Sequence, residues 1–192
     1  TLHGKTFGAL GAGRIGQCAM RIARGFGCKV LAYDPYENPK AAEEIGFEYA
    51  SVERVLRESD VVSLHLPLTE ASHHIISAAS LATMKRGAIL INTSRGGLIN
   101  SAALIEALKS GQIGGVGLDV YEMEEGVFFH DLSDRPLQDD KLARLMIFPN
   151  VLITSHQGFL TREALHAIAT TTLGSATAFE RGEPVINQVK LG

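Results

Sequence analysis

The sequence is poor in features that would place it in a specialised class of protein. Its 192 residues include only two cysteines, Cys18 and Cys28, and no tryptophan. A disulfide scaffold or a cysteine-based metal centre needs more thiols than this. We therefore expect both cysteines to be small apolar residues packed in the interior, and we predict no metal site.

Long apolar runs and an excess of basic charge are also missing. No run approaches the roughly 20 apolar residues of a membrane-spanning helix, and the first residues lack the pattern of a signal peptide. Lysine and arginine total 18 against 21 acidic residues, a formal net charge of −3. The sequence contains no basic patch of the kind that would predict a nucleic-acid partner. We expect a cytoplasmic protein that binds neither nucleic acid nor membranes.

What the chain does contain is the composition of an ordinary globular domain, with 45% hydrophobic and 20% charged residues. Its length predicts one domain, or one and a half. Since Thr1 is not an initiating methionine and an apolar segment begins almost at once, we expect a fragment or an excised domain.

Three glycines near the N-terminus have the spacing G-x-G-x-x-G. Gly11, Gly13 and Gly16 lie between an apolar run, Thr6–Leu10, and an amphipathic run over residues 14–26. In a strand-turn-helix context this is the dinucleotide-binding fingerprint. The first glycine permits the tight turn, the second lets the backbone approach the pyrophosphate, and the third lets the helix pack close to the strand. Three glycines also suit any tight turn between a strand and a helix.

The helix predicted over residues 14–26 has apolar side chains at helical spacing. They predict the face that packs on the sheet: Ile15, Cys18, Ala19, Ile22 and Phe26.

Asp34 strengthens the dinucleotide interpretation. It follows a second apolar strand, residues 28–33, and lies 18 positions after Gly16, close to the ~20 expected for the acid that binds an adenosine ribose. A carboxylate there accepts hydrogen bonds from the 2′-hydroxyl and repels a 2′-phosphate, which favours NAD over NADP. The alternative is a turn-forming aspartate ahead of Pro35.

The rest of the chain alternates predicted strands with predicted helices, which indicates parallel βαβ units. We expect a doubly wound α/β fold with a mainly parallel sheet and helices on both faces. Further strands are predicted at residues 60–66, 88–93, 115–120 and 151–155, with a short edge strand at 47–50. A last helix is predicted over 161–181, with a buried face formed by Leu165, Ile168, Thr172, Leu173, Ala176 and Phe179.

A segment of thirty residues between Val120 and Val151 shows only a weak helical pattern, near residues 138–145. Loops of this length in compact domains are usually functional or disordered, and this one is too apolar for disorder. We expect its large apolar side chains to pack, against a partner subunit or another domain: Phe128, Phe129, Leu137 and Leu145.

Three polar residues follow predicted strands, where open α/β sheets bind their ligands. They are Arg95, Glu124 and His156. An arginine can anchor a carboxylate, and a histidine can donate a proton near neutral pH. A glutamate beside that histidine favours its charged form.

Each of these residues also has a simpler interpretation. Arg95 can be solvated or bound to a carbonyl, and His156 can be a capped loop histidine. Glu124 belongs to the acidic run 122–125, which would normally face water, and spacing alone does not choose it over Glu122. Asp119 can be a structural acid at the end of a strand.

The motifs GAGRIG, YDP, HLPLT, INTSRGGLIN, GLDVYE and SHQGFLT occur in this order. Together they resemble the Rossmann-like NAD-binding domain of the D-isomer-specific 2-hydroxyacid dehydrogenases, over the whole chain. The segments FFHDLSDRPLQDD and SHQGFLTREAL are similar to the D-lactate dehydrogenase branch of these oxidoreductases. The resemblance implies that Arg95 binds the substrate carboxylate and helps polarise the keto group. It also implies that Glu124 pairs with His156, the proton donor.

The resemblance also implies a set of NAD contacts. A further one falls on Ser72, where relatives often have asparagine. The implied contacts are Gly11, Gly13, Arg14, Ile15, Gly16, Asp34, Leu66, Pro67, Thr93, Ser94 and Asp119.

By the same resemblance, residues 1–192 form the dinucleotide-binding domain. A substrate domain of roughly a hundred residues would precede it in the family and is absent here, and the tail 183–192 would lead back toward it. The implied reaction is the reversible, NAD-dependent reduction of a 2-keto acid, pyruvate being favoured, to the D-2-hydroxy acid. Another D-2-hydroxy acid and an NAD(H)-sensing, corepressor-like family member remain alternatives. Assembly as a homo-oligomer is left open.

Overall fold

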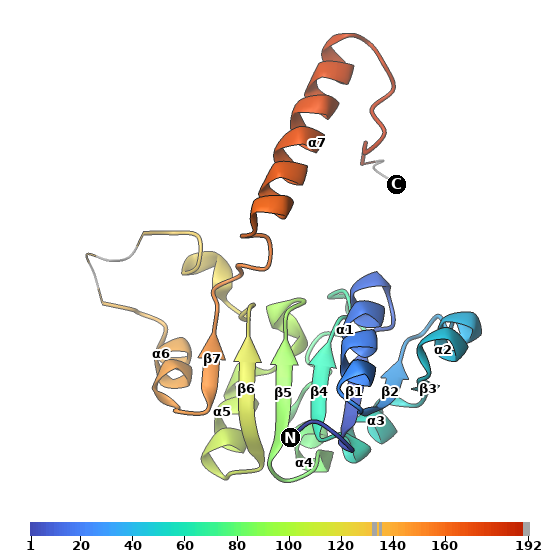
Figure 1. The fold of residues 1–192 in the computed structure, drawn as a ribbon. Helices are drawn as coiled ribbons and strands as arrows, with labels where there is room; N and C mark the ends of the chain where they lie inside the picture. Colours follow the sequence, from blue (N-terminus) through green and yellow to red (C-terminus); the bar gives the residue numbers. More distant parts are fainter. Residues whose placement is uncertain (132–133, 135, 190–192) are drawn as a thin grey trace. The chain divides into compact units, whose positions relative to one another are not determined.

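The structure is a computed structural model that describes residues 1–131, 134 and 136–189. It divides into two compact units, Thr1–His156 and Gln157–Gly192. Within the described residues of the first unit, seven strands form one parallel sheet in the order β3-β2-β1-β4-β5-β6-β7 (Figure 1). The order reverses between β1 and β4, so the predicted doubly wound α/β fold is confirmed.

The elements follow the predicted sequence of strands and helices. The strands are β1 (Thr6–Leu10), β2 (Lys29–Tyr33), β3 (Glu48–Tyr49), β4 (Val61–Leu64), β5 (Ala88–Asn92), β6 (Ile113–Leu118) and β7 (Val151–Ile153). The helices are α1 (Arg14–Gly25), α2 (Pro39–Ile45), α3 (Val52–Glu58), α4 (Ala78–Thr83), α5 (Ser101–Lys109), α6 (Asp140–Ile147) and α7 (Arg162–Glu180), with short 3₁₀ turns at Gly96–Leu98 and Glu124–Gly126.

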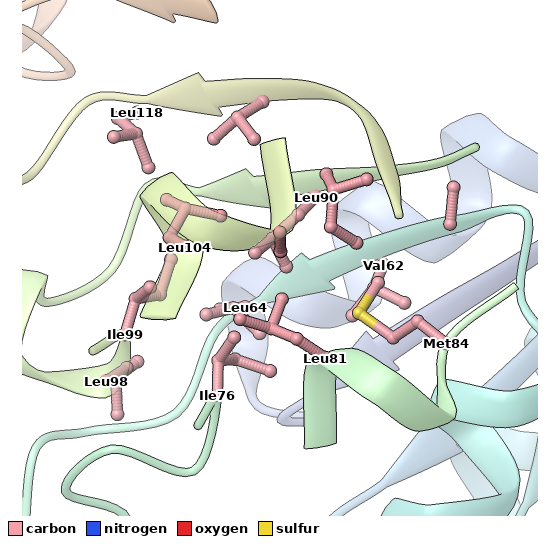
Figure 2. Close-up of a cluster of buried hydrophobic side chains, with 14 of the residues drawn as sticks. Val62, Leu64, Ile76, Leu81, Met84, Leu90, Leu98, Ile99, Leu104 and Leu118 are labelled. Carbon is pink, nitrogen blue, oxygen red and sulfur yellow. The ribbon is translucent and has the colours of Figure 1, made fainter. Parts of the chain in front are cut away.

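Side chains alternate across the sheet and build a separate core on each face. On one face, Ala9 and Ala32 pack with Met20 of α1 and with α2. On the other face, a larger core contains residues of strands β1, β2, β4, β5 and β6 and of helices α3, α4, α5 and α6. Figure 2 shows part of it, with Leu64 and Leu90 of the sheet near Leu81 of α4. Helices therefore cover both faces, although Ile89 of β5 and Leu152 of β7 stay exposed.

Side chains and a glycine mark the ends of two helices. Asn38 accepts a hydrogen bond from the amide of Ala41 at the start of α2, and Gly46 ends that helix with φ +78°. Asn100 caps α5 in the same way through the amide of Ala103, 2.9 Å away. Side-chain caps satisfy backbone donors that a helix cannot satisfy itself.

The predicted buried face of α1 is wrong. The helix buries Gly16, Met20 and Ala23, whereas Ile15, Cys18, Ile22 and Phe26 are exposed. A Cβ on Gly16 would lie 2.1 Å from the carbonyl oxygen of Gly11. The face with the smallest residue therefore packs against the sheet, because only it allows so close an approach. The expectation that both cysteines are buried holds for Cys28 alone.

The predicted buried face of α7 is wrong as well. None of its residues is buried, and Leu173 and Phe179 are 68% and 80% exposed. In the described part of the second unit, α7 is the single helix and no strand accompanies it. Its apolar stripe therefore has no element of its own unit to pack against.

The long segment after β6 packs on this domain itself. Leu145 of α6 is fully buried, and Phe128 and Leu137 pack against the larger core, so the expected external partner is not needed for them. Phe129 is 58% exposed. Residues 132, 133 and 135 of the FFHDLSDRPLQDD segment lie outside the described residues. In the described chain, no helix has both the length and the apolarity to cross a membrane.

Candidate active site

The glycine turn lies at the carboxyl end of β1 and opens onto α1. Gly11 has φ +109°, and a Cβ there would stand 2.6 Å from the backbone of His65, so both conformation and space require glycine. A Cβ on Gly13 would meet no atom within 4 Å, and α1 has no side-chain cap. The turn thus leaves open backbone and uncapped N–H groups at a helix N-terminus, which fits a diphosphate.

Asp34 follows β2 and is tied to this turn. Its Oδ2 accepts a hydrogen bond from the amide of Ala12 at 2.7 Å, and its Oδ1 accepts one from the amide of Tyr36 at 2.9 Å. The second bond is that of a turn-forming aspartate. The first places the carboxylate beside the glycine turn, as the ribose-binding role requires. The two roles are therefore compatible.

The loop after β4 runs close to the glycine turn. Ser94 donates a hydrogen bond to the carbonyl oxygen of Leu66 at 2.5 Å. The hydroxyl of Ser72 is buried, donates to the carbonyl oxygen of Pro67 at 2.7 Å and accepts from the amide of Thr69 at 2.8 Å. The structure thus gives Ser72 a role in folding this loop. Burial lowers the pKa of nearby His65.

The turn that carries Arg95 is held by a buried amide. Asn92, fully buried at the end of β5, accepts from the amide of Ser94 at 3.1 Å and donates to the carbonyl oxygen of Arg95 at 2.9 Å. Arg95 is exposed, and its Nη1 donates to the carbonyl oxygen of Ser94. Thr93 is exposed beside it. The turn presents a guanidinium at the carboxyl edge of the sheet.

Glu124 and His156 form a hydrogen-bonded pair. Nδ1 of His156 lies 2.9 Å from Oε1 of Glu124, whose Oε2 accepts from the amide of Tyr121 at 2.8 Å. Their side chains are only 32% and 15% exposed. The acidic run alone predicts that Glu124 faces water, and the structure shows that it does not. Ser155 and His156 both have positive φ, 53° and 56°, a strained conformation of the kind found at functional sites.

Asp119 binds the segment that carries His156. Its carbonyl oxygen accepts from the amide of His156, and its Oδ1 accepts from the hydroxyl of Thr154. The aromatic ring of Phe129 lies 5.7 Å from the imidazole of His156, between ring centroids. This ring contact had no signal in the sequence.

Glu122, the other candidate in the acidic run, has a different partner. Its Oε1 lies 2.6 Å from Nε2 of His74, and its Oε2 accepts from the amide of Ser101 at 3.1 Å. Burial raises the pKa of Glu122, but the bonds from Ser101 and His74 outweigh burial, so the pKa lies below its usual value. Geometry thus separates two carboxylates that spacing could not.

The three predicted catalytic residues lie on loops that follow adjacent strands, β5, β6 and β7. A cation suited to a carboxylate and an imidazole–carboxylate pair suited to proton transfer therefore share the edge that carries the glycine turn. Sequence reasoning missed Asn92 and His74. A polar residue ending an apolar strand was the available signal for Asn92, and His74 had none.

A parallel sheet that reverses its strand order beside a glycine turn, with an acid ending the second strand, defines a dinucleotide-binding domain. Residues 1–158 match the family described as D-isomer specific 2-hydroxyacid dehydrogenase, NAD binding domain. The chain belongs to this family, and its domain binds NAD.

Individual proteins of known sequence or structure are also similar to this chain. The 2-hydroxyacid dehydrogenase A of Aspergillus oryzae is 53% identical over 93% of this chain and 51% of its own length. The D-lactate dehydrogenase of Escherichia coli is 48% identical over 98% and 57%, respectively. A solved structure of the pyruvate reductase of Chlamydomonas reinhardtii superposes with a TM-score of 0.93 and 46% identity, over 97% of this chain and 57% of that one. The chain thus spans about half the length of the curated relatives that it matches.

Proposed function

We propose that the protein to which this chain belongs reduces a 2-keto acid to the D-2-hydroxy acid, reversibly, with NADH as the reductant. The observation that carries the proposal is the Glu124–His156 pair, which lies at the same sheet edge as Arg95 and the glycine turn. Residues 1–192 are the dinucleotide-binding part of that protein.

The glycine turn and its neighbours hold the cofactor. The uncapped N-terminus of α1, with Arg14 and Ile15, receives the diphosphate. Asp34 accepts hydrogen bonds from the ribose hydroxyls. The remaining contacts come from loops at the same edge: Leu66, Pro67, Thr93, Ser94 and Asp119. When bound, NADH supplies the hydride.

Arg95 binds the carboxylate of the substrate and stabilises the negative charge that grows on the keto oxygen. Its exposed guanidinium offers several donors, and a planar fork suits a carboxylate. Stabilisation of developing charge by a preorganised cation is a large term in many enzymes. Asn92 and Gly96 hold the turn that aims it.

His156 donates the proton to the keto oxygen through Nε2, since Nδ1 is bound to Glu124. The carboxylate orients the ring, and the protonated imidazole is the form that donates a proton in reduction. In the reverse direction, neutral His156 takes the proton from the hydroxyl group.

Pyruvate is the favoured substrate, because the names of two similar proteins refer to pyruvate reduction and D-lactate. Another 2-keto acid would use the same three residues, because they act on the shared carboxylate and keto group. An NAD(H)-sensing protein with little turnover is the competing function.

Assays of the full-length protein test the proposal. NADH oxidation is followed with a panel of 2-keto acids that differ in side chain, and the product is resolved on a chiral column. We expect saturable turnover, greatest with pyruvate, and a D-product. Tight NADH binding without turnover of any 2-keto acid would support the sensing protein and refute the enzyme.

A further inference from the structure

The second histidine–glutamate pair joins three segments that are far apart in the sequence. His74 lies in the loop between β4 and α4, Glu122 follows β6, and Ser101 begins α5. Glu122 accepts hydrogen bonds from both other residues, at 2.6 and 3.1 Å. The side chains of His74 and Glu122 are 27% and 19% exposed, so the contact is partly shielded from water.

The hydrogen-bond partners of His74 indicate its tautomer. Asn100 uses its Oδ1 to accept from the amide of Ala103, so its Nδ2 faces Nδ1 of His74, at 3.4 Å. An amide nitrogen only donates, so Nδ1 of His74 must accept. The ring proton then lies on Nε2 and is donated to Glu122. This tautomer is inferred from its partners.

The same loops hold the turn that carries Arg95. The amide of His74 donates to the carbonyl oxygen of Gly97 at 2.9 Å, and the amide of Ile76 donates to that of Leu98 at 3.0 Å. The 95–100 turn is thus bound on one side by the His74 loop. On the other side, Gly96 lies against the backbone of Tyr121 and Glu122.

The backbone of His74 is strained in this position, with φ +51°. A left-handed conformation is unfavourable for a non-glycine residue and persists where surrounding contacts enforce it. The bonds to Glu122, Asn100 and Gly97 are the contacts that do so here.

We propose that His74 and Glu122 form a latch that fixes the Arg95 turn, and that Glu122 is therefore a positioning residue for binding the substrate carboxylate. The part of this inference that concerns substrate rests on the proposed function. The part that concerns the turn does not. Glu124 thus orients His156, whereas Glu122, two residues away, positions the turn that carries Arg95.

Hydrogen exchange of the full-length protein tests the latch without any reaction. His74 and Ser101 donate to different oxygens of Glu122, and glutamine replaces one of these oxygens with a donating NH2 group, so one of the two bonds is lost. In Glu122→Gln and in His74→Ala, amide exchange of Ser101 and of the 95–100 turn should become at least about tenfold faster, because these amides open locally. The control is Glu125→Gln, an exposed member of the same acidic run.

Steady-state kinetics test the consequence for substrate. Glu122→Gln should raise the KM for the 2-keto acid about tenfold, an effect expected when a charged contact is misplaced, and should leave the NADH affinity within about twofold. A loss of folded protein would lower activity without changing KM. The double variant with His74→Ala should be no worse than the single variants, since both remove one latch.

The outcomes separate the two proposals. Unchanged exchange of the 95–101 amides in Glu122→Gln would overturn the latch. Faster exchange with an unchanged KM would overturn its role in carboxylate binding. A parent protein that reduces no 2-keto acid would refute the proposed function, whereas the exchange data would still decide whether the latch orders the turn.

Discussion

Gly96 lies directly against the carbonyl group of Tyr121. A Cβ built on Gly96 would stand 2.0 Å from that oxygen and 2.5 Å from the backbone nitrogen of Glu122. Since both neighbours are backbone atoms, no side-chain rotation can make room. This contact joins the turn that carries Arg95 to the loop that carries Glu124.

Gly96→Ala should therefore displace the Arg95 turn. We expect a loss of about 1 to 3 kcal/mol in the free energy of unfolding, typical of overpacking, and a fall in kcat/KM that exceeds the loss of folded protein. Urea unfolding and steady-state kinetics measure the two effects. Gly25→Ala is the matched control, because a Cβ there meets no atom within 4 Å. A Gly96→Ala protein as active and stable as the Gly25→Ala protein would contradict this packing.

The two thiols should differ in reactivity. Cys18 is exposed on α1, whereas Cys28 is 2% exposed and its thiol donates to the carbonyl oxygen of Leu2. Brief alkylation of the native protein, followed by mass spectrometry of the peptides, should label Cys18 far faster than Cys28. Denaturation should equalise them. Preferential labelling of Cys28 would mean that α1 packs as the apolar pattern predicts and not as the glycine requires.

The sequence predicts the fold well because its strongest signals are local. The order of strands and helices and the glycine turn follow from patterns of a few residues. The faces of α1 and α7 are predicted wrongly because apolar spacing shows which residues align, not what lies opposite. In α1, Gly16 determines which face is buried. In α7 no face is buried, because the described part of its own unit contains no element to pack against.

Position in the chain predicts the parts of the candidate site, whereas only the family resemblance implies that Glu124 pairs with His156. Arg95, Glu124 and His156 are found at strand ends by position. The choice between Glu122 and Glu124 depends on His74 and His156, which reach the acidic run from loops 48 and 32 residues away. Such distant contacts leave no spacing to recognise.

Asp60 should make stability depend on pH. It accepts from the amide of Thr6 at 2.8 Å and pairs with Lys85 at 3.2 Å and Lys5 at 3.7 Å. Burial raises the pKa of Asp60, but these contacts outweigh it and hold the pKa below the usual value. A depressed carboxyl pKa stabilises the folded state above the unfolded pKa of about 3.9, and the stabilisation is lost as pH falls through the folded pKa.

Asp60→Asn should remove that contribution. We expect it to lower the free energy of unfolding by about 1 kcal/mol at pH 7 and to flatten the dependence on pH between about 5 and 3. Urea unfolding at several pH values measures both. Glu43→Gln, at an exposed position of α2, is the control. Parallel curves for the Asp60→Asn and unmutated proteins would show that the contacts of Asp60 contribute nothing.

Asp34 should decide between the two nicotinamide dinucleotides. The full-length protein should bind NADH much more tightly than NADPH, since the carboxylate repels a 2′-phosphate. Asp34→Ala should reduce the difference between the affinities for NADH and NADPH. It should also weaken the binding of NADH, because the amides of Ala12 and Tyr36 lose their acceptor. Calorimetry with both dinucleotides measures this, with Glu37→Ala as the control. Equal affinities in the unmutated protein would remove the proposed role of Asp34.

In the proposed reaction, His156, paired with Glu124, supplies the proton that reduces the 2-keto acid. Glu124→Gln keeps the size of the side chain but removes one of the two oxygens that accept from Nδ1 of His156 and from the amide of Tyr121. The imidazole should then lose its orientation, and kcat should fall. His156→Ala should lose a factor on the order of 10²–10⁴ in kcat.

The most direct test is kcat for pyruvate reduction by the full-length protein, measured for Glu124→Gln, with Glu122→Gln as the comparison within the same acidic run. We predict that Glu124→Gln lowers kcat by about tenfold or more, because a misoriented imidazole transfers its proton poorly, whereas Glu122→Gln raises KM and leaves kcat within about twofold. A kcat that falls with Glu122→Gln and not with Glu124→Gln would contradict the pairing of Glu124 with His156 as the proton-donating unit.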